Sequence, residues 1–383
     1  MDIANLALQR DKYRHLSDDE WRWFLQQEEG RQRTADKLPT FAAMPDWWYP
    51  VRLSCEQCSS ELTARYKSSI LPSFQGGVGG RLLDLTAGYG VDTYFLSEQF
   101  AHTDYVERDA ELCRIAAHNF SQPTPSLPKG KEICVHNATA EAFLETAGMY
   151  DLIFLDPARR DSHGGKVFRL EDCTPNVVAL LPTLLAHLSP NGHILLKLSP
   201  MLDITQAVKE LSAVSLQWSV YVVAVKNEVK ELLLLSGGTG AITAIDLAEP
   251  EKAFVFTREE EQEAPFSFHL SPFIFLYEPN AAILKAGAYK LVAQRFGLSK
   301  ADMNTHLYFS DSLVTGFPGR VWQIKAKGEV VRGEKANVLV RNYPLTPEQL
   351  KKKMRIRDGG NDYVIGCRVA GKPTLFLAER IET

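Results

Sequence analysis

A carboxylate and two glycines stand together where one apolar run of the chain ends. The run Arg81–Thr86 contains Asp84, and Gly88 and Gly90 follow before a helical pattern begins. Glycines there let the backbone approach a ligand closely, and α/β proteins bind ligands at the carboxyl edge of the sheet. The Asp84 carboxylate would repel a pyrophosphate, and Thr93 replaces the third glycine of a dinucleotide-binding motif. The pattern therefore favours a ligand with a cationic centre and an amino group, such as S-adenosylmethionine, over a nicotinamide cofactor.

Polar residues also end the next two predicted strands. Glu107 lies 23 residues after Asp84, where a carboxylate can accept both hydroxyls of a ribose. The third strand ends at Asn137 and Ala138, whose side-chain carbonyl and backbone N–H are suited to reading an adenine edge. One such residue is most often a solvated strand end, but three at consecutive strand ends indicate a binding site.

The fourth strand ends in Asp156-Pro157-Ala158-Arg159, and Lys197 lies in the fifth. A carboxylate at this place can accept a hydrogen bond from a substrate amine and align its lone pair. Arg159 and Lys197 can hold phosphate or carboxylate groups. The alternative for Lys197 is a structural ion pair.

Strand-like and helix-like segments alternate between residues 80 and 236, which predicts a mostly parallel sheet covered on both faces. One helix is expected after a Thr174 cap, with Pro175 at its first position. Only Lys226 to Glu228 separate the last two strands, so we expect them to form an antiparallel hairpin. The seven predicted strands are Arg81–Thr86, Thr103–Glu107, Glu132–His136, Leu152–Leu155, His193–Leu198, Val220–Val225 and Val229–Leu235.

Two further regions flank this one, giving predicted domains of residues 1–78, 79–247 and 248–383. The first region reads as helical, with a capping box at Ser17 and Glu20 and a second helix opening at Ser54 and Gln57. The last region begins with an acidic stretch, expected to be a hairpin or linker. A helix over Glu278–Phe296, strands and a final hairpin follow, which predicts a small α+β layer.

The central region resembles the class I S-adenosylmethionine-dependent methyltransferases, which have a glycine loop, a ribose acid and an Asp-Pro motif in this order. The resemblance implies a Rossmann-like seven-stranded α/β sheet, with Asp156 near the transferring methyl group. It implies that the methionine end is held from Asp84 to Gly90, the ribose at Glu107 and the adenine at Asn137 and Ala138. The expected cofactor-binding residues are Asp84, Thr86, Ala87, Gly88, Gly90, Asp92, Glu107, Arg108, Asn137 and Ala138, and the expected catalytic residues are Asp156, Pro157, Arg159 and Lys197.

The outer regions resemble a family of methyltransferases called THUMP-like. The resemblance rests on Tyr277–Ala281 and Phe317–Arg320 in the C-terminal region, and on Glu56–Glu61 and Lys226–Glu231 elsewhere. It extends over nearly the whole chain. The family name implies a relation to an RNA-binding module, so rRNA or tRNA is the expected partner.

Two departures from known motifs limit which acceptor atoms the enzyme could methylate. Ala158 and Arg159 stand where amino-directed nucleic-acid methyltransferases carry a base-stacking aromatic residue. The fifth strand is followed by Ser199, not by the cysteine nucleophile needed to methylate uridine at carbon 5, and a serine is a poor substitute without a general base. Direct transfer to nitrogen or oxygen remains, in which alignment of the attack supplies much of the catalysis.

Composition limits the remaining choices. No apolar run approaches the ~18 residues that span a bilayer, and six scattered cysteines in 383 residues predict neither a disulfide framework nor a metal site, so the expected location is the cytoplasm. The net charge of −4 conceals a basic segment, because residues 341–372 hold eight Lys and Arg against three carboxylates. We therefore expect N-methylation of structured RNA. A small-molecule or protein methyltransferase, or an RNA-binding protein with a vestigial cofactor site, is the alternative.

Overall fold

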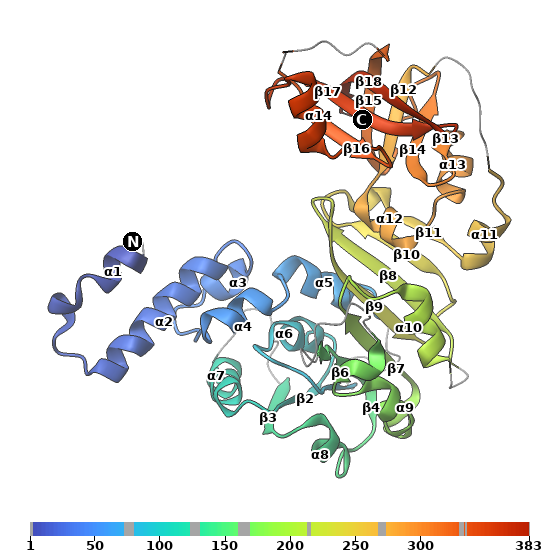
Figure 1. Ribbon diagram of the computed structural model, residues 1–383. Helices are drawn as coiled ribbons and strands as arrows, with labels where there is room; N and C mark the ends of the chain where they lie inside the picture. The colour runs from blue at the N-terminus through green and yellow to red at the C-terminus, as the bar shows by residue number, and fades with distance from the viewer. Residues whose placement is uncertain are drawn as a thin grey trace. The chain divides into compact units, whose positions relative to one another are not determined.

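The computed structural model describes residues 3–72, 80–122, 131–159, 169–212, 216–266, 273–328, 333 and 335–382 (Figure 1). The chain divides into two compact units. The first comprises Met1–Trp218 and Leu233–Gly238, and the second Ser219–Leu232 and Thr239–Thr383. Among the described residues, no helix is long and apolar enough to cross a membrane.

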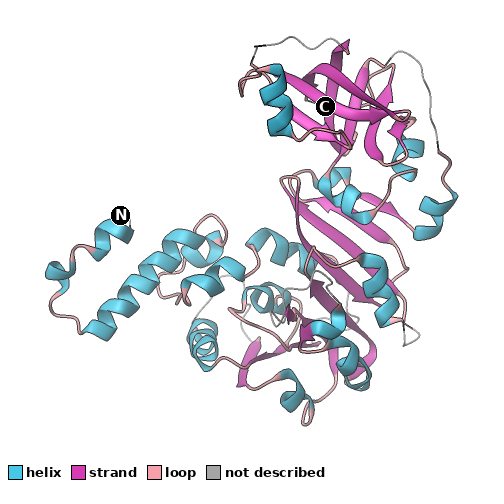
Figure 2. Ribbon diagram, in the orientation of Figure 1, coloured by secondary structure: helices cyan, strands magenta, loops and turns pink. Residues whose placement is uncertain are grey.

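The first unit opens with helices alone, as Figure 2 shows. Ser17 and Glu20 form the predicted capping box. The expected helix start at Ser54 is wrong, because Cys58 is extended and ends one helix, while Ser60 caps the next by accepting from the Thr63 N–H. The elements are α1 (Ile3–Ala7), η1 (Arg10–Tyr13), α2 (Asp18–Thr34), α3 (Pro39–Ala42), α4 (Arg52–Gln57) and α5 (Glu61–Ser69).

All seven predicted strands are present, and they lie in one nine-stranded sheet of order β11-β10-β8-β9-β7-β4-β1-β2-β3. Strands β3, β2, β1, β4 and β7 pair in parallel, so their carboxyl ends meet at one edge. The predicted α/β fold class is confirmed. The strands of this set are β1 (Arg81–Asp84), β2 (His102–Glu107), β3 (Glu132–Asn137), β4 (Tyr150–Leu155), β7 (Leu188–Leu198), β8 (Trp218–Val225) and β9 (Glu228–Ser236).

Helices connect the parallel strands, and one of them begins later than expected. Thr174 pairs with Ala158 in a two-stranded ladder, so it cannot cap a helix, and Asn176 caps instead by accepting from the Ala179 N–H. The connecting elements are α6 (Val91–Ser97), α7 (Ala110–Ser121), α8 (Ala140–Leu144), β5 (Ala158–Arg159), η2 (Leu170–Asp172), β6 (Cys173–Thr174), α9 (Val177–Ala186) and α10 (Ile204–Leu211).

A two-residue turn joins β8 to β9. Lys226 and Asn227 both have positive φ angles, 52° and 63°, which suits the right-handed twist of a hairpin. The sheet then gains two strands beyond the predicted seven, since β10 (Ile242–Asp246) pairs with β8 and β11 (Phe254–Phe256) with β10. The acidic stretch is therefore a 3-10 turn (η3, Pro250–Lys252), this short strand and α11 (Arg258–Glu263).

The second unit also contains a seven-stranded sheet of order β13-β14-β12-β15-β18-β17-β16. The expected helix over Glu278–Phe296 is wrong in its first turn, because Glu278 is in a strand and two helices follow. The strands are β12 (Phe275–Pro279), β13 (Ser299–Asp302), β14 (Thr305–Ser310), β15 (Gly319–Lys327), β16 (Asn337–Arg341), β17 (Asp362–Val369) and β18 (Lys372–Ile381), and the helices are α12 (Ala281–Ala286), α13 (Leu291–Phe296) and α14 (Pro347–Met354).

Candidate active site

The loop between β1 and α6 turns sharply at its two glycines. Gly88 has φ +55° and Gly90 has φ +82°, a conformation that residues with a Cβ rarely adopt. Gly90 is also crowded, since a Cβ there would stand 2.7 Å from the Phe120 ring. The Gly88 carbonyl accepts a hydrogen bond from the Tyr105 hydroxyl. The loop backbone is thus held against β2 and α7, and its other side lines a cavity.

Asp84 lies beneath this loop with no exposed surface. Its carboxyl accepts from the Thr86 N–H at 3.1 Å and from the Thr93 hydroxyl at 2.6 Å. Burial raises the pKa of Asp84 to about 8, although both hydrogen bonds oppose the shift. The structure therefore places Asp84 under the glycine loop, where it fixes the loop's shape, and not on the cavity wall.

Glu107 ends β2 and lines the cavity. One carboxylate oxygen accepts from the Gly88 N–H at 3.0 Å and the other from the Asp109 N–H at 2.9 Å. The side chain is therefore fixed before any ligand arrives. Because each carboxylate oxygen has two lone pairs, both can still accept a hydroxyl from a bound ribose.

The end of β3 supports Glu107. The Asn137 amide donates to the carbonyls of Glu107 and Arg108, both at 3.0 Å. The Ala138 N–H donates to the Glu107 carbonyl at 3.1 Å. Ala138 lines the cavity and Asn137 does not. The backbone N–H expected to read an adenine edge is thus already engaged.

Asp156 ends β4 and is held from two sides. Its N–H donates to the Thr86 hydroxyl at 2.5 Å, which ties the end of β4 to the glycine loop. Its carboxylate forms an ion pair with Lys197 of β7. The Asp156 side chain is 38% exposed, whereas that of Lys197 is 13% exposed, so the carboxylate is the accessible member of the pair.

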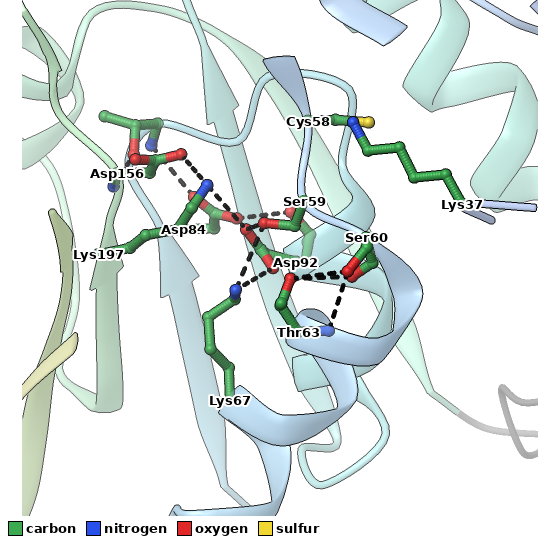
Figure 3. Close-up of polar contacts among 12 residues, drawn as sticks. Lys37, Cys58, Ser59, Ser60, Thr63, Lys67, Asp84, Asp92, Asp156 and Lys197 are labelled. Carbon is green, nitrogen blue, oxygen red and sulfur yellow. Dashed lines mark hydrogen bonds and ion pairs between the residues drawn. The ribbon is translucent and has the colours of Figure 1, made fainter. Parts of the chain in front are cut away.

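A buried charge network continues from Lys197 toward the N-terminal helices (Figure 3). Lys197 Nζ lies 3.6 Å from Asp92 Oδ2, and Lys67 Nζ lies 3.2 Å from Asp92 Oδ1. The Ser59 hydroxyl donates to Asp92 at 2.7 Å. Burial alone would raise the pKa of Asp92, but the two ammonium groups and Ser59 outweigh it, so this pKa is lowered. Asp92 therefore carries its charge between two lysines.

Lys67 is fully buried, and it was not among the site residues predicted from the sequence. Lysine is rarely buried without a partner, but its position in α5, 25 residues before Asp92, gave no signal that the two would meet. Ser59 was likewise not predicted as a site residue. It appeared only within Glu56–Glu61, one of the segments that resemble the THUMP-like family. The N-terminal helices therefore contribute polar groups to the site that strand-end reasoning cannot find.

These residues surround a cavity of about 310 Å³. Asp84, Asn137 and Pro157 lie off its wall, and Arg159 lies in β5. Residues that the sequence did not predict also line it, among them Ser54, Gln57, Cys58 and Ser59 from the N-terminal region and Thr174 and Pro175 beside β6. The predicted residues on the wall are Thr86, Ala87, Gly88, Gly90, Asp92, Glu107, Arg108, Ala138, Asp156 and Lys197.

The charged groups of this wall favour a cationic ligand. Carboxylates outnumber cations by four to two, since Asp92, Glu107, Glu141 and Asp156 stand against Arg108 and Lys197. The wall also carries glycine backbone and the Phe154 and Leu112 side chains. A ligand with a sulfonium, an ammonium group, a ribose and a flat base fits these groups. The donor set is therefore suited to S-adenosylmethionine.

The fold and this site together define a class I methyltransferase. A crystal structure of a candidate methyltransferase from Porphyromonas gingivalis W83 is 32% identical, with a TM-score of 0.84, over 96% of this chain and 92% of that one. Family models for a ferredoxin-like domain and a THUMP domain-like region match residues 275–318 and 318–380. The chain belongs to the family of the P. gingivalis protein, S-adenosylmethionine-dependent methyltransferases with a C-terminal THUMP-like domain. This confirms the predicted family, enzyme class and cofactor.

More distant likenesses concern only part of the chain. A 16S rRNA methyltransferase of T. thermophilus in complex with AdoMet and guanosine is 20% identical, with a TM-score of 0.32, over 49% of this chain and 43% of that one. A likeness at this level says nothing about the substrate of the present chain. Among curated proteins the sequence has no match.

Proposed function

We propose that this methyltransferase transfers the methyl group of S-adenosylmethionine to a nitrogen of a nucleotide in structured RNA. The observation that carries the proposal is the Asp156–Lys197 ion pair on the wall of the cavity, with the carboxylate as its accessible member. An anchored carboxylate, in a chain whose fifth strand is followed by Ser199 and not by a cysteine nucleophile, suits direct transfer to an amine.

The cofactor supplies an activated methyl group on its sulfonium. In our proposal Glu107 accepts the ribose hydroxyls, because both its oxygens are already oriented by backbone N–H groups. The glycine loop from Thr86 to Gly90 holds the methionine end. Ala138 and its neighbours pack beside the base, since Ala138 and Thr139 line the cavity.

Asp156 then orients the acceptor. Its carboxylate accepts a hydrogen bond from the substrate amine, which directs the nitrogen lone pair along the line of attack. Lys197 keeps the carboxylate in place, and Asp92 with Lys67 keeps Lys197 in place. The proton released after transfer can pass from the nitrogen to Asp156 and on to water.

The RNA part of the proposal rests on the second unit. It contains the THUMP domain-like region, and its helix α14 presents Lys352 and Lys353 to solvent, followed by exposed Arg355 and Arg357. Lys351, in contrast, forms an ion pair with Asp358 at 2.5 Å. Exposed cations in such a cluster suit phosphate groups.

The test is transfer of a tritiated methyl group from the cofactor to total RNA of a strain that lacks this protein. We expect incorporation into that RNA and much less into RNA of the parent strain, whose sites are already methylated. Asp156→Ala should lower incorporation by at least 100-fold while S-adenosylhomocysteine still binds. Incorporation into protein or small molecules only would support a different substrate class, and cofactor binding without any transfer would support a vestigial site.

A further inference from the structure

A second cluster of chemically active side chains lies on edge strand β3 and on its neighbour β2, away from the cavity. Strands β2 and β3 pair in parallel with His102 opposite Glu132 and Asp104 opposite Cys134. Side chains two residues apart on a strand point to the same face. His102, Asp104, Cys134 and His136 therefore project from one face of this strand pair.

The ligand atoms of three of these residues lie close together, and His136 is joined to them through Asp104. The nearest ligand atoms of His102, Asp104 and Cys134 all lie within 4.8 Å of one another. His102 Nε2 is 3.2 Å from Asp104 Oδ2, and His136 Nε2 is 2.7 Å from Asp104 Oδ1. Ligands about 2.0–2.3 Å from a tetrahedral Zn²⁺ lie about 3.3–3.8 Å apart. The three side chains would therefore have to draw together by up to about 1 Å, and His136 would have to turn from Asp104 Oδ1 toward the ion.

The surrounding groups have the arrangement of an outer shell. The second ring nitrogen of His102, Nδ1, lies 3.2 Å from the Glu132 carboxylate, which turns Nε2 inward toward Asp104. Asp104 Oδ2 accepts from the Tyr150 hydroxyl at 2.8 Å and from the Arg81 guanidinium at 3.2 Å. Metal-binding histidines are oriented by carboxylates in this way.

Charge and access also suit a divalent ion. A thiolate, the Asp104 carboxylate and two neutral imidazoles would balance two positive charges. Arg81, which contacts Asp104, adds one positive charge beside the site, and Glu132, which contacts His102, adds one negative charge. Asp104 is buried, whereas the His102 and His136 side chains are 28% and 36% exposed. An ion can therefore enter from solvent and meet a buried carboxylate.

We propose that His102, Asp104, Cys134 and His136 bind one zinc-type transition-metal ion that clamps edge strand β3 to β2. Imidazole, thiolate and carboxylate are the ligands that Zn²⁺ takes in proteins. Glu107 and Asn137 end the same two strands, so the ion would stiffen the strands that carry the ribose-binding carboxylate. This site is independent of the methyl-transfer proposal.

The test uses the full-length protein after treatment with a chelator, titrated with Co²⁺ and then with Zn²⁺. We expect one equivalent of Co²⁺ to bind with a thiolate charge-transfer band and the intense visible absorption of a tetrahedral site. Zn²⁺ should displace it and raise the melting temperature. Cys134→Ser should remove the charge-transfer band, and Glu132→Gln should weaken Zn²⁺ binding by about tenfold or more.

Two controls make the result specific. His15 is exposed, so His15→Ala should leave metal binding unchanged, and so should Cys58→Ser in the separate Cys55/Cys58 pair. Far-ultraviolet circular dichroism of the metal-free variants shows that they are folded. Absence of stoichiometric binding would overturn the proposal and leave a histidine–carboxylate hydrogen-bond network. Binding that survives Cys134→Ser but is lost in Cys58→Ser would also overturn it.

Discussion

Buried carboxyl groups under the glycine loop behave in opposite ways although they are close in sequence. Asp84 accepts hydrogen bonds from Thr86 and Thr93, and burial, together with the charges of Asp92 and Asp156, raises its pKa to about 8. Asp92 lies between Lys67 and Lys197, and its pKa is lowered. The difference follows from the neighbouring charges and not from the depth of burial.

The first prediction concerns the pH dependence of stability. The ordinary pKa of 3.8 for Asp84 rises to about 8 in the fold, so between these values the folded chain keeps a proton that the unfolded chain has lost. Asp84 therefore makes the free energy of unfolding fall as the pH rises from about 4 to about 8, by up to ~1.4 kcal/mol per pH unit. Denaturant unfolding across this range should show a smaller fall in Asp84→Asn. If the exposed-site control Asp311→Asn flattened the curve equally, the assignment would be wrong.

The second prediction concerns Lys67, which is fully buried. Lys67→Met should lower the free energy of unfolding by about 3 kcal/mol, because it leaves the buried Asp92 charge under-compensated. The double variant Lys67→Met/Asp92→Asn should recover part of the loss, and exposed Lys12→Met should cost little. Strictly additive losses in the double-mutant cycle would contradict a direct coupling.

Strand ends were the part of the site that sequence could predict. Glu107, Asp156 and Lys197 each follow from the rule that parallel strands present their carboxyl ends at one edge, and all three line the cavity. The rule says where a residue lies but not which way its side chain turns. That is why Asn137 was expected at the adenine and in fact supports the Glu107 and Arg108 carbonyls.

At the scale of elements, hydrophobic patterns in the sequence predicted where the strands lie. Only the pairing register of the strands shows which side chains become neighbours. No spacing along the chain links His102 to Cys134, because the two become neighbours only when β2 and β3 pair. The β5–β6 ladder was missed for a related reason, since two-residue strands have no periodicity. Thr174 was consequently assigned to a helix cap and lies instead opposite Ala158.

The third prediction concerns the glycine loop. Gly90 and Gly316 both have positive φ, but a Cβ would meet Phe120 at 2.7 Å in the first case and nothing within 4 Å in the second. Gly316→Ala should thus cost only the conformational penalty, about 1–2 kcal/mol. Gly90→Ala should cost clearly more and weaken S-adenosylhomocysteine binding, as measured by denaturation and calorimetry. Equal costs at the two positions would show that the contact with Phe120 relaxes freely.

On the scale of the whole molecule, the net charge of −4 averages two unlike stretches. Acidic residues gather in and around α11, and basic residues in and after α14. Some of the basic residues form ion pairs within the second unit, since Arg341 and Arg320 both pair with Glu278. Lys352 and Lys353 of α14, in contrast, are exposed.

The fourth prediction follows from these lysines. Lys352→Gln/Lys353→Gln should weaken RNA binding and reduce the slope of log affinity against log salt concentration by up to about 2. Lys325→Gln is the matched control in the same unit, because Lys325 is paired with Asp362 at 2.7 Å and Glu379 at 2.8 Å. Filter binding at several salt concentrations gives both slopes. Equal slopes for all three proteins would remove α14 from the RNA interface.

The N-terminal helices have a consequence for how this enzyme can be divided. Their residues supply part of the cavity wall and, through Lys67, one of the two cations that balance Asp92. A truncated chain that began at β1 would lose this part of the cavity wall and Lys67 together. The sheet alone could therefore not be exchanged as a separate module with the sheet of another methyltransferase. In this chain the N-terminal helices and the sheet therefore build the site together.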